Sequence, residues 1–191
     1  MSLIVYGSKP SPYVRRIRML LADQPHEFRV TNIYDDATRQ QYADLSPIRK
    51  LPILVADGET IFDSHVIASY LFDRLGQPQP TLAEHNLVSA VDAVTDSLII
   101  MLMTKNSNLE VDPERLLWKL QLERIPDSLA WLERQAEAGA FNEWGYPVIA
   151  LITLVEWVAF RGLYDFSAYP ALLAACSQFA ERPAVTDTRP E

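Results

Sequence analysis

The sequence LIVYGSKPSPYVRRIRMLL, residues 3 to 21, predicts a strand, a loop and a helix. Residues 3 to 6 are strand formers closed by Gly7. After the loop, apolar side chains recur at helical spacing, at Val14, Ile17, Leu20 and Leu21. A weaker alternation from Glu27 to Ile33 predicts a second strand. The chain should therefore begin with a β-α-β unit in which the helix is the crossover.

A hairpin and a helix are predicted next. The strand-forming runs 51–56 and 60–62 flank Asp57-Gly58-Glu59, where Asp-Gly supplies the positive backbone angles of a tight turn. An apolar helical stripe then runs from Val66 to Leu71 and ends near Gly76. The order of elements in the first 75 residues is thus β-α-β followed by β-β-α.

A proline-containing segment, Gly76-Gln77-Pro78-Gln79-Pro80, predicts a linker between two domains. We assign residues 1–76 to an α/β domain, 77–83 to the linker and 84–191 to an all-helical domain. The helical assignment rests on leucines at helical spacing, on an apolar stretch too long for one strand, and on a final helix. These are Leu116, Leu117, Leu120, Leu129 and Leu132, then Val148 to Phe160, then Pro170 to Ala180.

The composition is that of a globular protein in a reducing compartment. The chain has 191 residues, of which 49% are hydrophobic and 22% charged, and a single cysteine, Cys176. The three histidines show no metal-binding spacing, so no metal is expected. No secretory signal is recognised, and the most apolar stretch is shorter than the roughly 20 residues that cross a bilayer. The prediction is a cytoplasmic protein without a membrane span.

The acidic charge is concentrated in the second part of the chain. Residues 1–75 hold nine basic and nine acidic residues, whereas residues 76–191 hold eight and sixteen, which gives the net charge of −8. A strongly acidic body repels polyphosphate, which argues against nucleic acid as the main ligand. A small anion could still bind to the balanced first part.

Three patterns, in this order and at these distances, resemble the glutathione S-transferase family. They are Ser11-Pro12-Tyr13-Val14-Arg15-Arg16-Ile17-Arg18, then Ser46-Pro47-Ile48-Arg49-Lys50-Leu51-Pro52-Ile53-Leu54, then Phe62-Asp63-Ser64-His65-Val66-Ile67-Ala68-Ser69-Tyr70-Leu71. Further similarity lies at 159–161, 169–172 and 181–185. The resemblance implies a thioredoxin-like glutathione-binding domain followed by a helical domain, and a homodimer that conjugates glutathione to small apolar electrophiles in detoxification. Glutathione-dependent isomerase or peroxidase activity belongs to the same expectation.

Ser11 is the candidate catalytic residue. It can cap the helix and Pro12 suits the first turn, so a thiolate there would lie at the positive end of the helix dipole. Lowering a thiol pKa of about 8.5 by roughly two units needs about 2.7 kcal/mol, which hydrogen bonding and the dipole can supply. The resemblance implies that Ser11 stabilises the glutathione thiolate. Tyr6 is the alternative hydroxyl, although its position in the first strand favours a place in the strand core.

The remaining candidates are glutathione-binding residues. The resemblance implies a cis peptide between Leu51 and Pro52 that leaves the Leu51 backbone to pair with glutathione. Lys50 offers charge to a carboxylate, or is a solvated surface lysine. Asp63 and Ser64 precede a helix, where a carboxylate and an amine can be bound, and Asp63 can equally be the helix cap.

The sequence departs from the family pattern in several places. Ser11 stands where many thioredoxin-like proteins have cysteine, so dithiol chemistry is not expected. Arg49 stands where the family usually has glycine. A Ser/Thr-x-x-Asp capping box is replaced by Gly145-Tyr146-Pro147-Val148, which predicts a helix less stable by about 1 kcal/mol.

Two functions remain open at this level. One is a glutathione transferase whose electrophile binds between the domains near Leu98, Met101, Leu102 and Met103, although such a stripe is also typical of a helix core. The other is a non-catalytic relative that binds a protein partner. Affinity for glutathione distinguishes them.

Overall fold

The chain forms two compact units. The computed structural model describes residues 2–32 and 35–191. One unit comprises Met1–Gln79 together with Ala180–Glu191, and the other comprises Pro80–Phe179. The segment 180–191 therefore belongs with the N-terminal unit, whereas the sequence assigned all of 84–191 to the helical domain.

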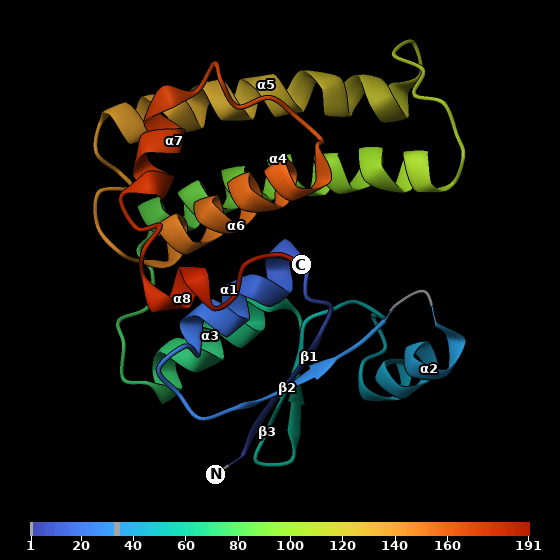
Figure 1. Ribbon diagram of the computed structural model, residues 1–191, viewed down its shortest axis with the longest axis vertical. Coiled ribbons are helices and arrows are strands. Elements are labelled where there is room, and N and C mark those ends of the chain that lie inside the picture. Colours follow the sequence, from blue (N-terminus) through green and yellow to red (C-terminus); the bar gives the residue numbers. More distant parts are fainter. Residues whose placement is uncertain (1, 33–34) are drawn as a thin grey trace. The chain divides into compact units, whose positions relative to one another are not determined.

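The N-terminal unit contains a four-stranded mixed sheet (Figure 1). Its strands are β1 (Leu3–Gly7), β2 (Glu27–Val30), β3 (Ile53–Ala56) and β4 (Glu59–Ile61), in the order β2-β1-β3-β4. β1 pairs with β2 in parallel, and β3 pairs antiparallel with both β1 and β4. The predicted β-α-β start and hairpin are confirmed. β2 ends before the predicted Ile33, which lies outside the described residues.

Two helices pack beside each other against this sheet, α1 (Pro12–Leu20) and α3 (Ser64–Arg74) (Figure 1). α1 lies so close to the end of β1 that a Cβ atom on Gly7 would collide with Val14. The core between sheet and helices consists of fully buried apolar side chains, at Val5, Val14, Ile17, Leu54, Ile67 and Leu71. Burial of each such side chain contributes about 1.5–3 kcal/mol.

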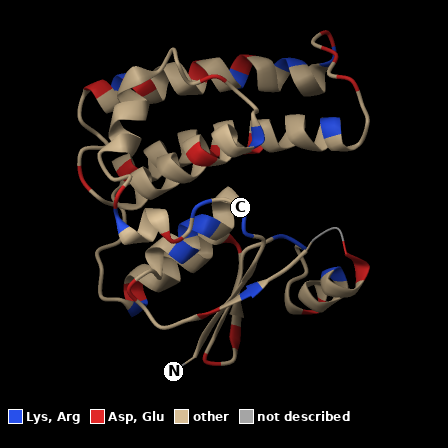
Figure 2. Cartoon of the chain, viewed as in Figure 1, with Lys and Arg blue, Asp and Glu red and all other residues tan. Residues whose placement is uncertain are grey.

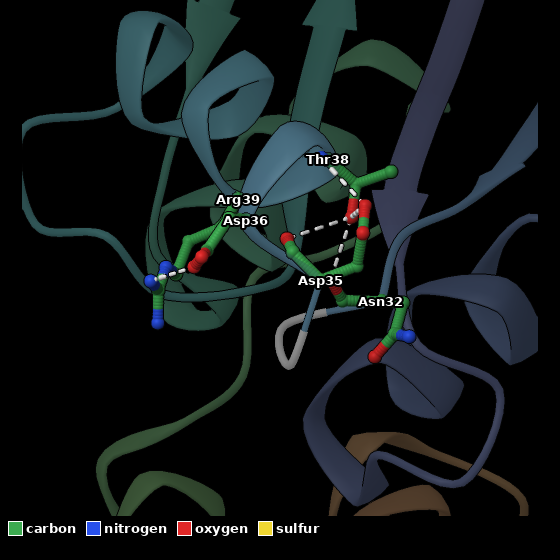
Figure 3. A network of polar contacts seen from close by, with 5 residues as sticks. All are labelled: Asn32, Asp35, Asp36, Thr38 and Arg39. Carbon is green, nitrogen blue, oxygen red and sulfur yellow. Dashed lines mark hydrogen bonds and ion pairs between the residues drawn. The ribbon is translucent and has the colours of Figure 1, made fainter.

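Among the helices that the sequence analysis missed is α2 (Asp36–Leu45). Asp35 caps it, because its carboxylate accepts the backbone N–H of Thr38 at 2.9 Å, and the Thr38 hydroxyl donates to the Asn32 carbonyl at 2.7 Å (Figure 3). Asp35 accepts hydrogen bonds from both the backbone N–H and the hydroxyl of Thr38, and these two bonds, the backbone one first, hold the pKa of Asp35 below its ordinary value. Tyr42 alone is buried along α2. A helix with a single buried position has no apolar stripe to recognise.

The second unit consists of helices, as predicted: α4 (Leu82–Asn106), α5 (Leu116–Glu137), α6 (Tyr146–Arg161) and α7 (Pro170–Ser177). α4 packs against both α5 and α6, and α7 packs against α5 and α6 (Figure 1). α6 is buried along most of its length and is therefore the core helix of this unit. Its N-cap, Gly145, makes no side-chain hydrogen bond, which confirms that the capping box is missing.

The predicted leucines of α5 differ in burial. Leu129 and Leu132 are fully buried, whereas Leu116, Leu117 and Leu120 are exposed.

Within the described ranges, one helix, α4, is long and apolar enough to cross a membrane, with a mean hydropathy of 1.7 over 18 residues. Half of that stretch is buried inside the protein, and core helices of globular proteins have the same property.

Candidate functional site

Three strand ends of the N-terminal unit meet at one end of the sheet. Tyr6, next to the end of β1, pairs with Ile53, the first residue of β3. In the next pair along the sheet, Leu54 of β3 lies opposite Ile61, the last residue of β4. Because both pairs are antiparallel, the end of β1, the start of β3 and the end of β4 lie side by side.

All three predicted motifs join the sheet at this end. The loop that carries Ser11 follows β1, the Lys50-Leu51-Pro52 segment precedes β3, and Asp63-Ser64 follows β4. Residues up to 53 positions apart in sequence are thereby gathered at this end of the sheet, and the N-termini of two helices lie among them. Helix N-termini present unpaired amides and positive dipole ends, so this end of the sheet is suited to a small anionic ligand.

Ser11 is the N-cap of α1. Its hydroxyl oxygen accepts the backbone N–H of Val14 at 3.3 Å, and its carbonyl accepts that of Arg15 at 3.0 Å. Pro12 occupies the first turn, as expected. α1 carries three arginines and no acidic residue (Figure 2), so its side chains add to the positive potential at the start of the helix.

Tyr6 points away from α1. Side chains alternate along a strand, and its neighbour Gly7 faces Val14 of α1, so the Tyr6 side chain lies on the opposite face of the sheet. There its hydroxyl accepts a hydrogen bond of 2.6 Å from Arg29, which also contacts Glu27 at 2.6 Å. The bond from Arg29 holds the pKa of Glu27 below its ordinary value. The geometry thus favours Ser11 over Tyr6 at the start of α1.

The peptide between Leu51 and Pro52 is cis, which confirms the expectation drawn from the resemblance. Leu51 lies two residues before β3, and Lys50 is exposed beside it. Arg49 has a φ of 50°, in the left-handed region that favours glycine. This explains why the family usually has glycine there and shows that the arginine is accommodated at a backbone position unsuited to it.

Asp63 is the N-cap of α3. Its Oδ1 atom accepts the backbone N–H of His65 at 3.0 Å, so the helix-cap interpretation of Asp63 is confirmed. Ser64 begins the helix and is 5% exposed. The peptide between Phe62 and Asp63 is also cis. The sequence analysis missed it, because no proline follows Phe62 to indicate a cis bond.

The remaining predicted positions lie on α4 of the second unit. Leu98 is buried and therefore belongs to the core, whereas Met101 and Leu102 are half-buried and Met103 is exposed. No group of three or more possible metal ligands occurs in the parts of the chain that the structure describes.

The sequence analysis assigned no role to the arginines of α1, and the structure shows a specific one for Arg15. Its guanidinium is buried and donates to Thr188 and to the carbonyl of Val185. The partners lie 173 and 170 positions away, so no local pattern could have indicated the contact.

Comparison with known proteins shows similarity to one family. The family model described as "Glutathione S-transferase, N-terminal domain" matches residues 5–79. A structure of a glutathione S-transferase from Methylobacillus flagellatus with glutathione bound superimposes with a TM-score of 0.86 and 23% identity, covering 100% of both chains. The N-terminal unit is thus a thioredoxin-like domain and the whole chain has the glutathione S-transferase fold. Residues 5–79 are thus similar to the N-terminal domain of glutathione S-transferases.

Two relatives match this chain over part of its length. The "Uncharacterized GST-like protein YibF" of Escherichia coli is 36% identical over 66 residues, 34% of this chain and 33% of that protein. The "Stringent starvation protein A homolog" of Haemophilus ducreyi is 26% identical over 74 residues, 39% of this chain and 35% of that protein. The chain thus spans about a third of the length of these two relatives.

Proposed function

We propose that this protein is a glutathione transferase that activates the thiol of glutathione at the start of α1. The observation that carries the proposal is the gathering of Ser11, the Leu51-Pro52 segment and the N-terminus of α3 at one end of the sheet. Support comes from the family match over residues 5–79 and from a structural neighbour described with glutathione bound.

Each candidate residue has a distinct part in this proposal. The Leu51 backbone pairs with the tripeptide as an added strand would, and Lys50 attracts a carboxylate. The amides of the first turn of α3 and the Ser64 hydroxyl bind the γ-glutamyl carboxylate, while Asp63 pairs with the γ-glutamyl amine. Ser11 donates a hydrogen bond to the thiolate that forms when the thiol loses its proton to water. The sulfur then attacks an apolar electrophile and displaces its leaving group, as chloride is displaced from chlorodinitrobenzene.

The test of the catalytic part compares two hydroxyls. We expect Ser11→Ala to lower kcat for chlorodinitrobenzene about 100-fold, because a hydrogen bond to a reacting anion is lost. Tyr6→Phe is the matched control, since it removes a hydroxyl from the other face of the sheet, and should leave kcat within twofold of the parent. The reverse result, a large loss in Tyr6→Phe alone, would transfer the catalytic role to Tyr6.

The binding part is tested separately by calorimetry. We expect Ser64→Ala to weaken glutathione binding by about tenfold to 100-fold, the effect of one hydrogen bond to a charged group. Val66→Ala, at an exposed position two residues further along the same helix, is the control and should bind as the parent does. Equal affinities in all three proteins would contradict the assignment of Ser64.

The second candidate function is a non-catalytic module that binds a protein partner. It is favoured by the names of the two curated relatives, neither of which states a transferase activity. Glutathione affinity separates the candidates, because a partner-binding module has no need to bind the tripeptide. Absence of binding at millimolar glutathione would favour this second function.

A homodimer in the cytoplasm completes the proposal. A single cysteine and a thiol co-substrate both fit a reducing compartment. The exposed leucines at the start of α5, Leu116, Leu117 and Leu120, offer apolar surface for a second copy. Light scattering should give about twice the mass of 21.7 kDa.

A further inference from the structure

The C-terminal segment Ala180–Glu191 lies along α1. It belongs to the same compact unit as α1, and its short helix α8 (Pro183–Thr186) packs against α1 (Figure 1). Val185 of this segment is fully buried. A helix that follows strand β1 at the start of the chain is thus covered by the last dozen residues of the sequence.

The innermost polar contact joins Arg15 to Thr188. Arg15 is 2% exposed, and its Nε donates to Thr188 Oγ1 at 3.1 Å while Nη2 donates to the Val185 carbonyl at 3.1 Å. Thr188 is 6% exposed, and its hydroxyl donates in turn to the Ala184 carbonyl at 2.7 Å. The threonine hydroxyl therefore accepts from the arginine and donates to the segment's own backbone, which fixes both groups.

Arg15 is directly connected to the proposed catalytic residue. Its backbone N–H donates to the Ser11 carbonyl at 3.0 Å, the hydrogen bond that closes the first turn of α1. Helical side chains lean toward the N-terminus, so the guanidinium of Arg15 extends from the turn that Ser11 caps. An immobilised, buried cation in that turn fixes its orientation and adds positive potential where a thiolate would be bound.

Two further contacts flank this one at the surface. Lys9, two residues before Ser11, forms an ion pair with Glu191, and Arg18 donates to the Asp187 carbonyl at 3.4 Å. The Lys9 and Glu191 side chains are 42% and 67% exposed, so water weakens their attraction. The exposed pair provides a control for the buried contact, because it joins the same two segments.

We infer that Arg15 is a positioning residue for Ser11, held by Thr188 of the C-terminal segment so that the first turn of α1 keeps the geometry that supports a glutathione thiolate. The inference rests on the proposed function. It makes residues 183–188, which lie far from Ser11 in sequence, part of the apparatus that sets the reactivity of the bound thiol.

The test varies Thr188, because removal of Arg15 itself would leave buried partners unsatisfied and could unfold the unit. Thr188→Val removes the hydroxyl and keeps the shape, whereas Thr188→Ser keeps the hydroxyl. For the parent and each variant, kcat and KM for glutathione are measured with chlorodinitrobenzene as the second substrate. The ultraviolet absorbance of the bound thiolate is followed as a function of pH, and the urea midpoint gives the stability. Glu191→Gln removes the exposed ion pair and serves as the control.

We expect Thr188→Val to lower kcat about threefold to tenfold with KM within twofold, and to move the thiol titration to higher pH. Thr188→Ser should recover most of kcat, and Glu191→Gln should match the parent. If the parent binds and ionises glutathione but Thr188→Val titrates as the parent does, the inference is wrong and the proposed function stands. Equal losses in the valine and serine variants would also contradict it. A parent that binds no glutathione would overturn both.

Discussion

At the scale of single residues, the site combines conformations that few residue types adopt. Arg49 has a φ of 50°, and it lies beside the Lys50-Leu51-Pro52 segment proposed to bind glutathione. A non-glycine residue in the left-handed region costs roughly 1–2 kcal/mol, because its Cβ approaches the following carbonyl. The backbone at this loop is therefore set by its surroundings and not by the preference of the arginine.

We expect Arg49→Gly to raise the free energy of unfolding by about 0.5–1 kcal/mol. Glycine removes the steric cost, and the greater freedom of the unfolded chain offsets only part of the gain. Urea unfolding followed by circular dichroism gives the measurement. Arg49→Ala is the matched control, since it removes the charge and keeps the Cβ. Equal stabilisation by alanine would assign the effect to the charge and contradict the backbone argument.

The residue scale also separates what sequence could predict from what it could not. Ser11 as a helix cap followed from residue type and position, and the structure confirms it. The cis peptide at Leu51-Pro52 was expected only because the motif resembles a family, since an ordinary X-Pro bond is cis only about one time in twenty. The Arg15 to Thr188 contact was not predictable, because 173 positions separate the two residues.

At the scale of elements, prediction succeeded where apolar periodicity or turn chemistry was strong. The Asp57-Gly58 turn indicated the β3-β4 hairpin, and the apolar run indicated α6. It failed for α2, which buries only Tyr42, and for α8, which packs on the N-terminal unit. Periodicity reports that a helix has an apolar face but not which unit covers that face.

The α6 helix allows a direct test of its missing cap. Gly145 is in extended conformation, which any residue adopts, and a Cβ there would lie 3.8 Å from Pro147 Cδ, an ordinary contact. A serine hydroxyl at this position could accept the backbone N–H of Val148. We expect Gly145→Ser to stabilise the protein by about 0.5–1 kcal/mol, measured as the urea midpoint at constant m-value.

Gly145→Ala serves as the comparison for this variant, because it reduces the freedom of the unfolded chain without providing a cap. Serine should exceed alanine by about 1 kcal/mol, the usual contribution of a capping hydroxyl. If the two variants are equally stable, the hydroxyl makes no cap.

The aspartate of the Ser/Thr-x-x-Asp capping box would stand at position 148. We expect Val148→Asp to be destabilising, because Val148 is 1% exposed and a carboxylate would be buried there.

At the scale of the whole molecule, carboxylates in both units have pKa values held below their ordinary range. Asp57 is one of them, and its carboxylate accepts hydrogen bonds from two other segments of the chain. Its Oδ2 accepts from Arg74 of α3 at 2.9 Å and its Oδ1 accepts the backbone N–H of Ser2 at 2.9 Å. The bond from Arg74 is the larger cause of the lowered pKa, and that from Ser2 is the second. Asp57 thus joins the hairpin turn to a helix and to the N-terminal segment.

The sign of the pH dependence follows from this direction. A carboxyl group whose pKa is lower in the folded protein binds fewer protons there than in the unfolded chain, so stability falls as the pH decreases. The contribution is fully present above the ordinary carboxyl pKa of about 4 and is lost below it, as pH falls through the folded value. We expect the urea midpoint of the parent to decrease between about pH 4.5 and pH 3, with part of this decrease due to Asp57.

The variant Asp57→Asn measures how much of the pH dependence of stability is due to Asp57. Asp57 has a φ of 51°, and asparagine tolerates the left-handed region as well as aspartate does, so the variant removes the titrating group without disturbing the turn. At pH 7 the variant should be less stable than the parent, and the difference should narrow toward pH 3. Asp23→Asn, at an exposed position in a turn, should instead follow the parent at every pH. A difference between Asp57→Asn and the parent that is constant from pH 7 to pH 3 would show that the contact of Asp57 does not depend on its charge.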